Sequence, residues 1–593
     1  VTGIYIVPFT NGLGDAIDIS SVKSYAKNLP GVAAVWDSAD FSLIDPVSIG
    51  GKIKEKNINL MVLAGDMPGF AKSFFSSAMA AAGKDPANVK LASFNENGAL
   101  TARDTEKAKA VVACAVHGIP FETAAVDGDC TVHPDTLVIG GGIAGIQASL
   151  EIADSGHKVY LVEKTATIGG HMAMFDKTFP TLDCAACILT PKMVEVGQHT
   201  NIDLMTYCEI SGISGTPGNY KVSVLKKARR VNLATCIGCG ICAEKCPEKV
   251  ASEFDSATIL RKAIYIPFPQ AVPNKYLIDA EHCSYVQSNK CGVCAKVCPV
   301  VDCINYDEKD EVVEITVGNI IVATGFNVFD AKRIENFGYG KFPNVVTSLE
   351  FERLVNAAGP TGGAITTRTQ DKKGNWIFLA DSPAPKSIAL IHCVGSRDEN
   401  YNKYCSKVCC MYSLKLAHLV TEKLPDAKVY EYYIDMRAFG KGYEEFYERI
   451  KGEGVNIIRG RTAKVEEKNK KLLIRSEDIE AGKLIEQEVD MVILAVGLEP
   501  RQDAGKIAGM LGISQTRDGW FSEMNYISDP VGTYTAGISI AGLCQGPKDI
   551  PDTVAQASAA ASRVIQSIIN GKMKTYAKDI NVSQIEKHVT KVS

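Results

Sequence analysis

The chain has 593 residues, 46% of them hydrophobic, and 64 basic against 68 acidic residues give a formal net charge of −4. We expect about three or four well-packed domains, no extended disorder and, because no basic stripe interleaved with aromatic residues occurs, protein partners rather than nucleic acid or a membrane surface. There is no run of about 18 apolar residues and no basic leader, so we predict neither a transmembrane helix nor a signal peptide. The 19 cysteines cluster at metal-ligand spacing, which favours a reducing, anaerobic cytoplasm.

Residues 1–133 are predicted to form a small α/β domain, because short apolar strands alternate with helical stretches. Gly3–Val7 and Asn59–Ala64 are the candidates for buried strands. Asp104–His117 is predicted to be a helix.

A dinucleotide-binding motif follows. The strand Thr136–Ile139 leads into Gly140-x-Gly142-x-x-Gly145, a helix, and a second strand, Lys158–Val162, that ends at Glu163. Glycine permits the tight turn and the approach of a pyrophosphate to the helix N-terminus, and Glu163 can accept hydrogen bonds from an adenosine ribose. Glycines used merely for close packing are the weaker alternative, because the strand, turn and helix occur in the required order.

FAD is favoured over NAD by segments further along the chain. Ile168–His171 resembles the turn after the first ribose site of flavoproteins with two dinucleotide-binding domains, and Ile320–Gly325 and Val492–Gly497 are strand-to-glycine segments of the kind that close such a fold. Thr535–Gly542 and the helix from about Pro551 resemble the segment that holds the ribityl and pyrophosphate of FAD. The predicted cofactor-binding residues are Gly140, Gly142, Ile143, Ala144, Gly145, Glu163, Lys164, Gly169, Gly170, His171, Ala323, Thr324, Gly325, Gly542, Lys548, Asp549 and Ile550.

Residues 233–308 carry two cysteine runs, each ending in Cys-Pro, as in a ferredoxin that binds two 4Fe-4S clusters. In such ferredoxins the last cysteine of each run ligates the other cluster. The second run departs from this pattern, since seven residues separate its first cysteine from the next. Zinc knuckles are the alternative, but they need neither a third cysteine at this spacing nor the proline. The predicted sets are Cys236, Cys239, Cys242 and Cys298 for one cluster, and Cys283, Cys291, Cys294 and Cys246 for the other.

A thioredoxin-reductase-like fold should carry a second glycine motif, for a nicotinamide nucleotide, near Lys386–Arg397. One glycine remains there, and Cys393 stands where the backbone should meet phosphate. Cys405, Cys409 and Cys410 follow, and we predict that these four cysteines hold a third cluster in place of NAD; four buried free thiols are the alternative.

A further pair, Cys184 and Cys187, allows two interpretations. The pair is either a redox-active disulfide that acts on the flavin or part of a fourth cluster, completed by Cys208, at the end of a predicted strand, and by Cys130 or Cys114. By default Cys544, Cys303, Cys114, His392 and His171 are assigned structural roles.

Several long motifs resemble the A subunits of heterodisulfide reductases over about residues 133–567. They are the glycine motif, Phe179–Met193, the cysteine runs, Tyr404–Lys415 with Tyr433–Gly442, and Gln545–Ala557. The resemblance implies FAD on a thioredoxin-reductase-like α/β fold, several 4Fe-4S clusters, and flavin-based electron bifurcation. It also implies that Cys393, Cys405, Cys409 and Cys410 bind a cluster near the flavin and that Lys415 lies near the isoalloxazine; a solvated surface cation is the alternative for Lys415.

The implied partners are other members of a cytoplasmic multi-subunit complex: proteins like the B and C subunits of heterodisulfide reductase, a hydrogenase- or dehydrogenase-linked electron donor, and ferredoxin. A dimeric form of this complex is left open. Two features depart from the family pattern. The cysteines that family members commonly carry in the N-terminal domain are missing at Val7–Thr10 and Ala64–Pro68. Many members also carry a C-terminal ferredoxin domain, whereas this sequence ends shortly after residue 567, so we expect that whatever that domain connects to is reached through a partner or not at all. A non-bifurcating relay and a scaffold held together by clusters are the alternative functions.

The predicted organisation is an α/β N-terminal domain and a split flavin domain, interrupted by a ferredoxin insertion and by a degenerate second nucleotide-binding domain. The boundaries are 1–133 for the N-terminal domain, 134–232, 309–384 and 491–567 for the flavin domain, 233–308 for the insertion, 385–490 for the degenerate domain and 568–593 for a tail.

Overall fold

The computed structural model describes residues 1–7, 13–37, 45–66, 68–95, 97, 99–119, 128–372, 374–533 and 535–575. Contacts divide the chain into two compact units, residues 1–132 with 505–538 and 570–593, and residues 133–504 with 539–569. Pro8–Thr10 and Met67, where the family pattern is lost, and residues 576–593 of the predicted tail lie outside the described residues.

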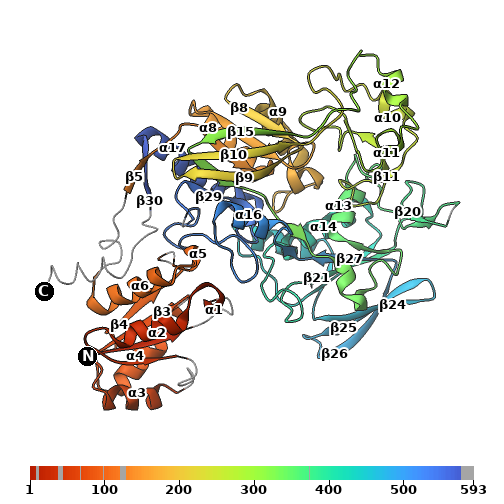
Figure 1. Ribbon diagram of the computed structural model, residues 1–593. Helices are drawn as coiled ribbons and strands as arrows, with labels where there is room; N and C mark the ends of the chain where they lie inside the picture. Colours follow the sequence, from red (N-terminus) through yellow and green to blue (C-terminus); the bar gives the residue numbers. More distant parts are fainter. Residues whose placement is uncertain are drawn as a thin grey trace. The chain divides into compact units, whose positions relative to one another are not determined.

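The first unit contains a four-stranded parallel sheet in the order β2-β1-β3-β4. It confirms the predicted strands and helix near the N-terminus, because β1 and β3 occupy those segments and Asp104 caps α6 with its carboxylate. Helices lie on both faces, over separate apolar cores (Figure 1). The elements are β1 Thr2–Val7, α1 Leu13–Ala16, α2 Ile19–Lys27, β2 Val32–Trp36, α3 Pro46–Glu55, β3 Leu60–Gly65, α4 Lys72–Ala81, β4 Val89–Ser93, α5 Ala99–Ala102, α6 Thr105–His117 and β5 Gly128–Thr131, which pairs with β30 Lys572–Thr575.

The second unit begins with a five-stranded sheet in the order β29-β16-β6-β7-β8. The central strand β6 is fully buried and runs parallel to β7 and β16, which explains why its residues read as a continuous apolar run. The elements are β6 Thr136–Ile139, α8 Ile143–Asp154, β7 Val159–Glu163, α9 Ala185–Gln198, β8 Ile202–Thr206, β16 Asn319–Val322, β29 Ile538–Ile540 and α17 Ile550–Asn570.

The cysteine-rich segment is an insertion into a three-stranded antiparallel sheet. In that sheet β10, Asn219–Lys226, pairs with both β9, Cys208–Thr216, and β15, Glu311–Val317. The chain therefore leaves this sheet after β10 and re-enters it at β15, and the residues between the two strands are the segment predicted to be an inserted domain. The insertion contains α10 Ile241–Lys245, β11 Val250–Ala251, β12 Leu260–Arg261, β13 Ile264–Tyr265, β14 Leu277–Ile278, α11 Ser284–Ser288 and α12 Val293–Val297.

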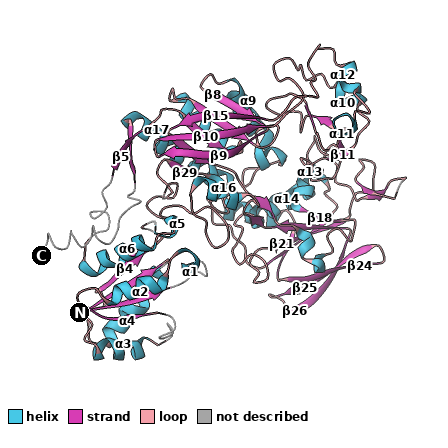
Figure 2. Ribbon diagram, viewed as in Figure 1, coloured by secondary structure: helices cyan, strands magenta, loops and turns pink. Residues whose placement is uncertain are grey.

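A second parallel sheet has the order β18-β27-β21-β22-β23. Two of its strands, β18 and β27, come from segments predicted to belong to the flavin domain, and here the structure differs from the predicted organisation. The strand β27 runs parallel to β21, and both strands are buried. A separate antiparallel sheet, β24-β25-β26, is drawn in magenta in Figure 2. The elements are β18 Val345–Thr347, α13 Ser348–Val355, β21 Ser387–Val394, α14 Cys409–Lys423, β22 Lys428–Tyr433, α15 Tyr443–Gly452, β23 Asn456–Arg459, β24 Thr462–Lys468, β25 Lys471–Asp478, β26 Lys483–Val489, β27 Met491–Val496 and β28 Leu498–Glu499.

The architecture is thus α/β, with two parallel sheets of the dinucleotide-binding kind in the second unit and a small α/β layer structure in the first. Among the described residues, no helix is both long and apolar enough to cross a bilayer.

Candidate functional site

A cavity of ≈ 650 Å³ lies in the second unit, lined by the β6–α8 turn, the end of β7, the start of α17, and residues of α13, α14 and the insertion. All predicted cofactor-binding residues line it except two glycines, Gly145 and Gly542. Gly145 has a packing role instead, since a Cβ there would lie 1.8 Å from the carbonyl oxygen of Gly140. The lining residues from the prediction are Gly140, Gly142, Ile143, Ala144, Glu163, Lys164, Gly169, Gly170, His171, Ala323, Thr324, Gly325, Lys548, Asp549 and Ile550.

The glycine turn leaves room for a phosphate group at the helix N-terminus. Gly140 has a φ of +106°, which favours glycine, and a Cβ at Gly142 would meet no atom within 4 Å. Gly142 is the N-cap of α8, so the first backbone N–H groups of that helix face this open space. The Glu163 carboxylate accepts a hydrogen bond from the Gly141 N–H at 2.7 Å, which fixes the acid at the end of β7.

His171 belongs to the cavity wall rather than to a packed core. Its ring stacks on Phe326 with 4.2 Å between centroids. Burial, with a smaller effect of Arg501, lowers the pKa of His171 to about 4, so the ring is neutral at neutral pH.

Lys415 also lines the cavity, and its interpretation as a solvated surface cation is wrong. Its side chain is 3% exposed and forms an ion pair with Glu352 of α13. The ammonium also donates to the carbonyl oxygen of Lys177 at 3.0 Å and lies 5.3 Å from the ring centroid of Phe175. A buried ammonium with a carboxylate partner is held in one place, which a surface lysine is not.

Part of the wall comes from the insertion, which no motif predicted. Phe254, Phe268 and Tyr265 line the cavity, and the first two rings stack at 4.4 Å. The buried ion pair between Arg353 of α13 and Asp255, at 3.0 Å, attaches this part of the insertion beside the cavity. Isolated aromatic residues have no spacing pattern, so the sequence offered no signal for them.

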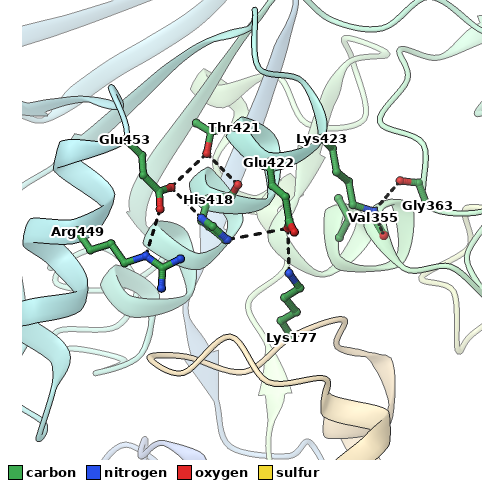
Figure 3. A network of polar contacts seen from close by, with 9 residues as sticks. All are labelled: Lys177, Val355, Gly363, His418, Thr421, Glu422, Lys423, Arg449 and Glu453. Atoms are coloured by element: carbon green, nitrogen blue, oxygen red, sulfur yellow. Dashed lines mark hydrogen bonds and ion pairs between the residues drawn. The ribbon is translucent and has the colours of Figure 1, made fainter.

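Polar contacts link Lys177, a residue of the cavity wall, to α14 (Figure 3). Lys177, a lining residue, donates to Glu422 at 2.9 Å. On the same helix His418 lies 2.8 Å from the Glu453 carboxylate, which also contacts Arg449. The segment around Lys177 is therefore anchored both by its backbone, through Lys415, and by its side chain.

The insertion brings its eight predicted cysteines into two groups. Each group surrounds a small hollow, and the members are those of the crossed assignment; among the described residues, no side chains gather as a ligand set for a single metal ion. Lys262 donates to the carbonyl oxygen of Cys246 at 2.5 Å, and Lys275 to that of Cys236, so each group has a cation nearby. One hollow is lined by Cys236, Cys239, Cys242, Cys298 and also Cys303, and the other by Cys246, Cys283, Cys291 and Cys294.

The four cysteines of the degenerate nucleotide site also come together. Cys393 is a buried residue near the end of β21 with a φ of +57°, and Cys409 and Cys410 begin α14. A hydrogen bond with Cys409 lowers the pKa of Cys393 to about 7, and hydrogen bonds with Cys409 and His392 lower the pKa of Cys410 to about 4. Cys405 is within electrostatic range of Cys393 and Cys410. Thiolates are the form that binds metal, so these shifts favour binding at Cys393 and Cys410. Burial raises the pKa of Cys405, and hydrogen bonds with Cys393 and Cys410 together with burial raise that of Cys409.

Two curated proteins, both A subunits of heterodisulfide reductases, resemble the chain along nearly its whole length. The chain is 43% identical to that of the H(2):CoB-CoM heterodisulfide,ferredoxin reductase of Methanothermobacter marburgensis, over 96% of this chain and 86% of that one. It is 44% identical to the first iron-sulfur A subunit of the CoB--CoM heterodisulfide reductase of Methanopyrus kandleri, over 96% and 85% of the two chains. The chain belongs to the family of heterodisulfide reductase A subunits.

Two further comparisons concern parts of the chain. Residues 135–176 match the family model described as FAD dependent oxidoreductase. The thioredoxin reductase of Lactococcus lactis (FR conformation) is 15% identical over 74% of this chain and 100% of that one, with a TM-score of 0.40. This member of the heterodisulfide reductase family is thus an oxidoreductase, an FAD-dependent electron-transfer protein.

The structure corrects the cluster interpretation of Cys184 and Cys187. These two cysteines form a disulfide, with Cα atoms 5.2 Å apart, and a sulfur in a disulfide is not available as a thiolate ligand. Cys208 lies at a strand end: it begins β9, two residues after β8 ends, is buried, and donates to the carbonyl oxygen of Thr206. Cys114 and Cys130 belong to the other unit.

His392 is buried against Glu431, with 2.6 Å between Nε2 and the carboxylate and neither side chain exposed. Burial opposes protonation, but hydrogen bonds with Cys410 and Glu431 together raise the pKa of His392 well above its ordinary value. It therefore supports the Cys410 thiolate, a role beyond that of a packed core histidine.

Proposed function

We propose that this chain is the flavin-bearing hub of a heterodisulfide-reductase-like complex and divides electrons between two chains of 4Fe-4S clusters. The observation that carries this proposal is the contact between the two candidate sites. Val408, Tyr412 and Lys415 line the cavity, and the cysteines that begin the same helix, Cys409 and Cys410, belong to the third cysteine group.

The residues present fit FAD. The open space at Gly142, the amide groups at the start of α8 and the carboxylate of Glu163 suit a pyrophosphate and a ribose, and Lys548 adds a cation at the wall. Bound FAD supplies chemistry in which two electrons are accepted together and released one at a time. Lys415 would then hold positive charge at the far end of the cavity, with Glu352 fixing its position.

The cysteine groups suit three 4Fe-4S clusters. Each group of the insertion offers four sulfurs around one small hollow, the third group brings four cysteines together, and each cluster would carry a single electron. Lys262 and Lys275 favour negative charge beside the two groups of the insertion, and His392 does so beside Cys410. The protein would in this way set the order in which the groups accept electrons.

Branching is supported by the relatives' names. The protein of Methanothermobacter marburgensis is named a heterodisulfide,ferredoxin reductase, a name with two acceptors. In this chain the cavity is lined partly by residues of the insertion and partly by Val408 and Tyr412, which flank Cys409 and Cys410, and these two sides would provide two routes. The partners we propose are proteins that reduce a disulfide, a ferredoxin and an electron-donating dehydrogenase or hydrogenase.

The test is a Cys409→Ser variant of the purified complex. We expect it to lose the iron of one cluster while FAD and the iron of the insertion remain, and to stop electron flow from FAD to one partner only. Cys544→Ser, a buried cysteine outside the three groups, is the matched control and should keep all iron. Full turnover to both acceptors after the loss of iron would contradict the hub role, and a complete iron content would contradict the ligand set.

A further inference from the structure

The disulfide between Cys184 and Cys187 lies on the surface, beside the cavity wall. Both cysteines are exposed, and Cys184 forms a backbone bridge with Lys177, a residue that lines the cavity. The Ala185 N–H donates to the Asp176 carbonyl oxygen at 3.0 Å, and the Thr178 N–H donates to Asp183 at 2.8 Å. The two cysteines therefore belong to a hairpin whose other limb is cavity wall, and Glu422 anchors that limb through Lys177 (Figure 3).

This disulfide is poorly suited to a purely structural role. It joins residues only three apart in the sequence, and the entropy that a disulfide removes from the unfolded chain is smallest for the shortest loops. Exposed disulfides are also the ones open to attack by thiols.

The pair also occupies a position that activates one sulfur. Cys184 is the N-cap of α9, a helix of 14 residues, and its Sγ accepts a hydrogen bond from the Cys187 N–H at 3.1 Å. That N–H and the positive end of the helix dipole both stabilise a thiolate on Cys184 when the bond is reduced. Cys187 lies within the first turn, where its own sulfur receives no comparable hydrogen bond in the described contacts.

We propose that Cys184 and Cys187 form a thiol–disulfide exchange site for an external disulfide, with Cys184 as the attacking sulfur and Cys187 as the resolving one. An external dithiol first reduces the protein disulfide by exchange and leaves as its own disulfide. In the reduced pair, the Cys184 thiolate then attacks the external disulfide, whose S–S bond breaks and releases one thiolate. Cys187 then attacks Cys184, which re-forms the protein disulfide and releases the second external thiol. The pair gives up two electrons and two protons, and the external disulfide takes them up.

The exchange can be measured on one peptide, since trypsin releases residues 178–192 with these two cysteines and no other. The protein with its cofactors is reduced under argon with dithiothreitol, alkylated and analysed by mass spectrometry. We expect two alkyl groups on this peptide after mild reduction, none before it, and renewed disulfide formation when hydroxyethyl disulfide is added. A peptide that stays oxidised, or is already reduced in the untreated protein, would overturn the exchange role.

The variants Cys187→Ser and Cys184→Ser test which of the two sulfurs attacks the external disulfide. With 5,5′-dithiobis(2-nitrobenzoic acid) at neutral pH, the remaining Cys184 should form the mixed disulfide about fivefold faster than the remaining Cys187, read on the same peptide. FAD and iron contents equal to those of the unsubstituted protein show that both variants fold. Equal rates, or a faster Cys187, would overturn the assignment of Cys184. Neither result bears on electron transfer through FAD, so the proposed function is tested separately.

Discussion

Lys415 and Glu352 form an ion pair at the cavity wall, with side chains 3% and 5% exposed. The pair joins α14, which begins with Cys409, to α13, which is linked through Arg353 to Asp255 of the insertion. Two buried ion pairs of α13 thus link three parts of the second unit beside the cavity.

Removing one member of this pair should destabilise the fold more than removing both. Glu352→Gln leaves a buried ammonium without its carboxylate, and Lys415→Met leaves the carboxylate, so each should lower the free energy of unfolding by about 3 kcal/mol. The double variant should lose less than either single variant, because neither charge is then left unpaired. Urea unfolding followed by circular dichroism measures this. The exposed pair Lys245 and Glu244 is the control, and Glu244→Gln should have no effect; additive losses at the buried pair would contradict the coupling.

Substitutions of two glycines in the first motif should affect different properties, FAD binding at Gly142 and folding at Gly145. At Gly142 a side chain meets no atom, so Gly142→Val should fold normally but lower the affinity for FAD by at least roughly tenfold, because it fills the space of the phosphate. At Gly145 a Cβ would lie 1.8 Å from the Gly140 oxygen, so Gly145→Ala should lower the yield of folded protein. Flavin fluorescence after denaturation gives the FAD content. Unchanged FAD in Gly142→Val would place the cofactor elsewhere, and Gly51→Val, equally unobstructed in the first unit, is the control.

The cluster content of Cys298→Ala and Cys303→Ala distinguishes a predicted cluster ligand from a neighbouring thiol that is not a ligand. Both cysteines line the hollow that contains Cys236, but only Cys298 belongs to the predicted set. We expect Cys298→Ala to lose about four irons and Cys303→Ala to lose none. Iron analysis, with electron paramagnetic resonance of the reduced protein, measures both. Loss of the cluster of the Cys283 set in Cys298→Ala would contradict the crossed assignment.

The stability of the second unit should fall in mild acid because of His171. Its pKa in the folded protein is about 4, below the ordinary value of 6.5, since burial disfavours the charged ring. The unfolded chain therefore binds more protons than the folded one between these pH values. The contribution of the neutral His171 ring to the free energy of unfolding is fully present above about pH 6.5 and is lost as the pH falls towards 4. His171→Phe keeps the stack on Phe326. It should reduce the difference between the free energies of unfolding at pH 7 and pH 4 by on the order of 2 kcal/mol. Thermal unfolding at several pH values measures it, and equal slopes for both proteins would refute this cause.

The sequence by itself determined the features that depend on short stretches of chain. The turn at Gly140 and the strand β6 need only the backbone preferences of neighbouring residues, and the predicted segment of β6 agrees with the structure residue for residue. The spacing of Cys236, Cys239 and Cys242 likewise sets three sulfurs in one loop, wherever that loop lies. The family was also recognisable from such contiguous motifs, and the relatives confirm it.

Only the tertiary structure decided which distant segments meet. An apolar strand such as β27 fits either parallel sheet, and its pairing with β21 depends on packing over the whole unit. The resemblance places Lys415 near the isoalloxazine, but only the packed chain brings Glu352, 63 positions earlier, beside it in the interior. Cys184 and Cys187 permitted both a disulfide and a cluster, and the bond between them at the start of α9 decided for the disulfide. Burial and long-range pairing are properties of the packed chain, so residue spacing alone does not contain them.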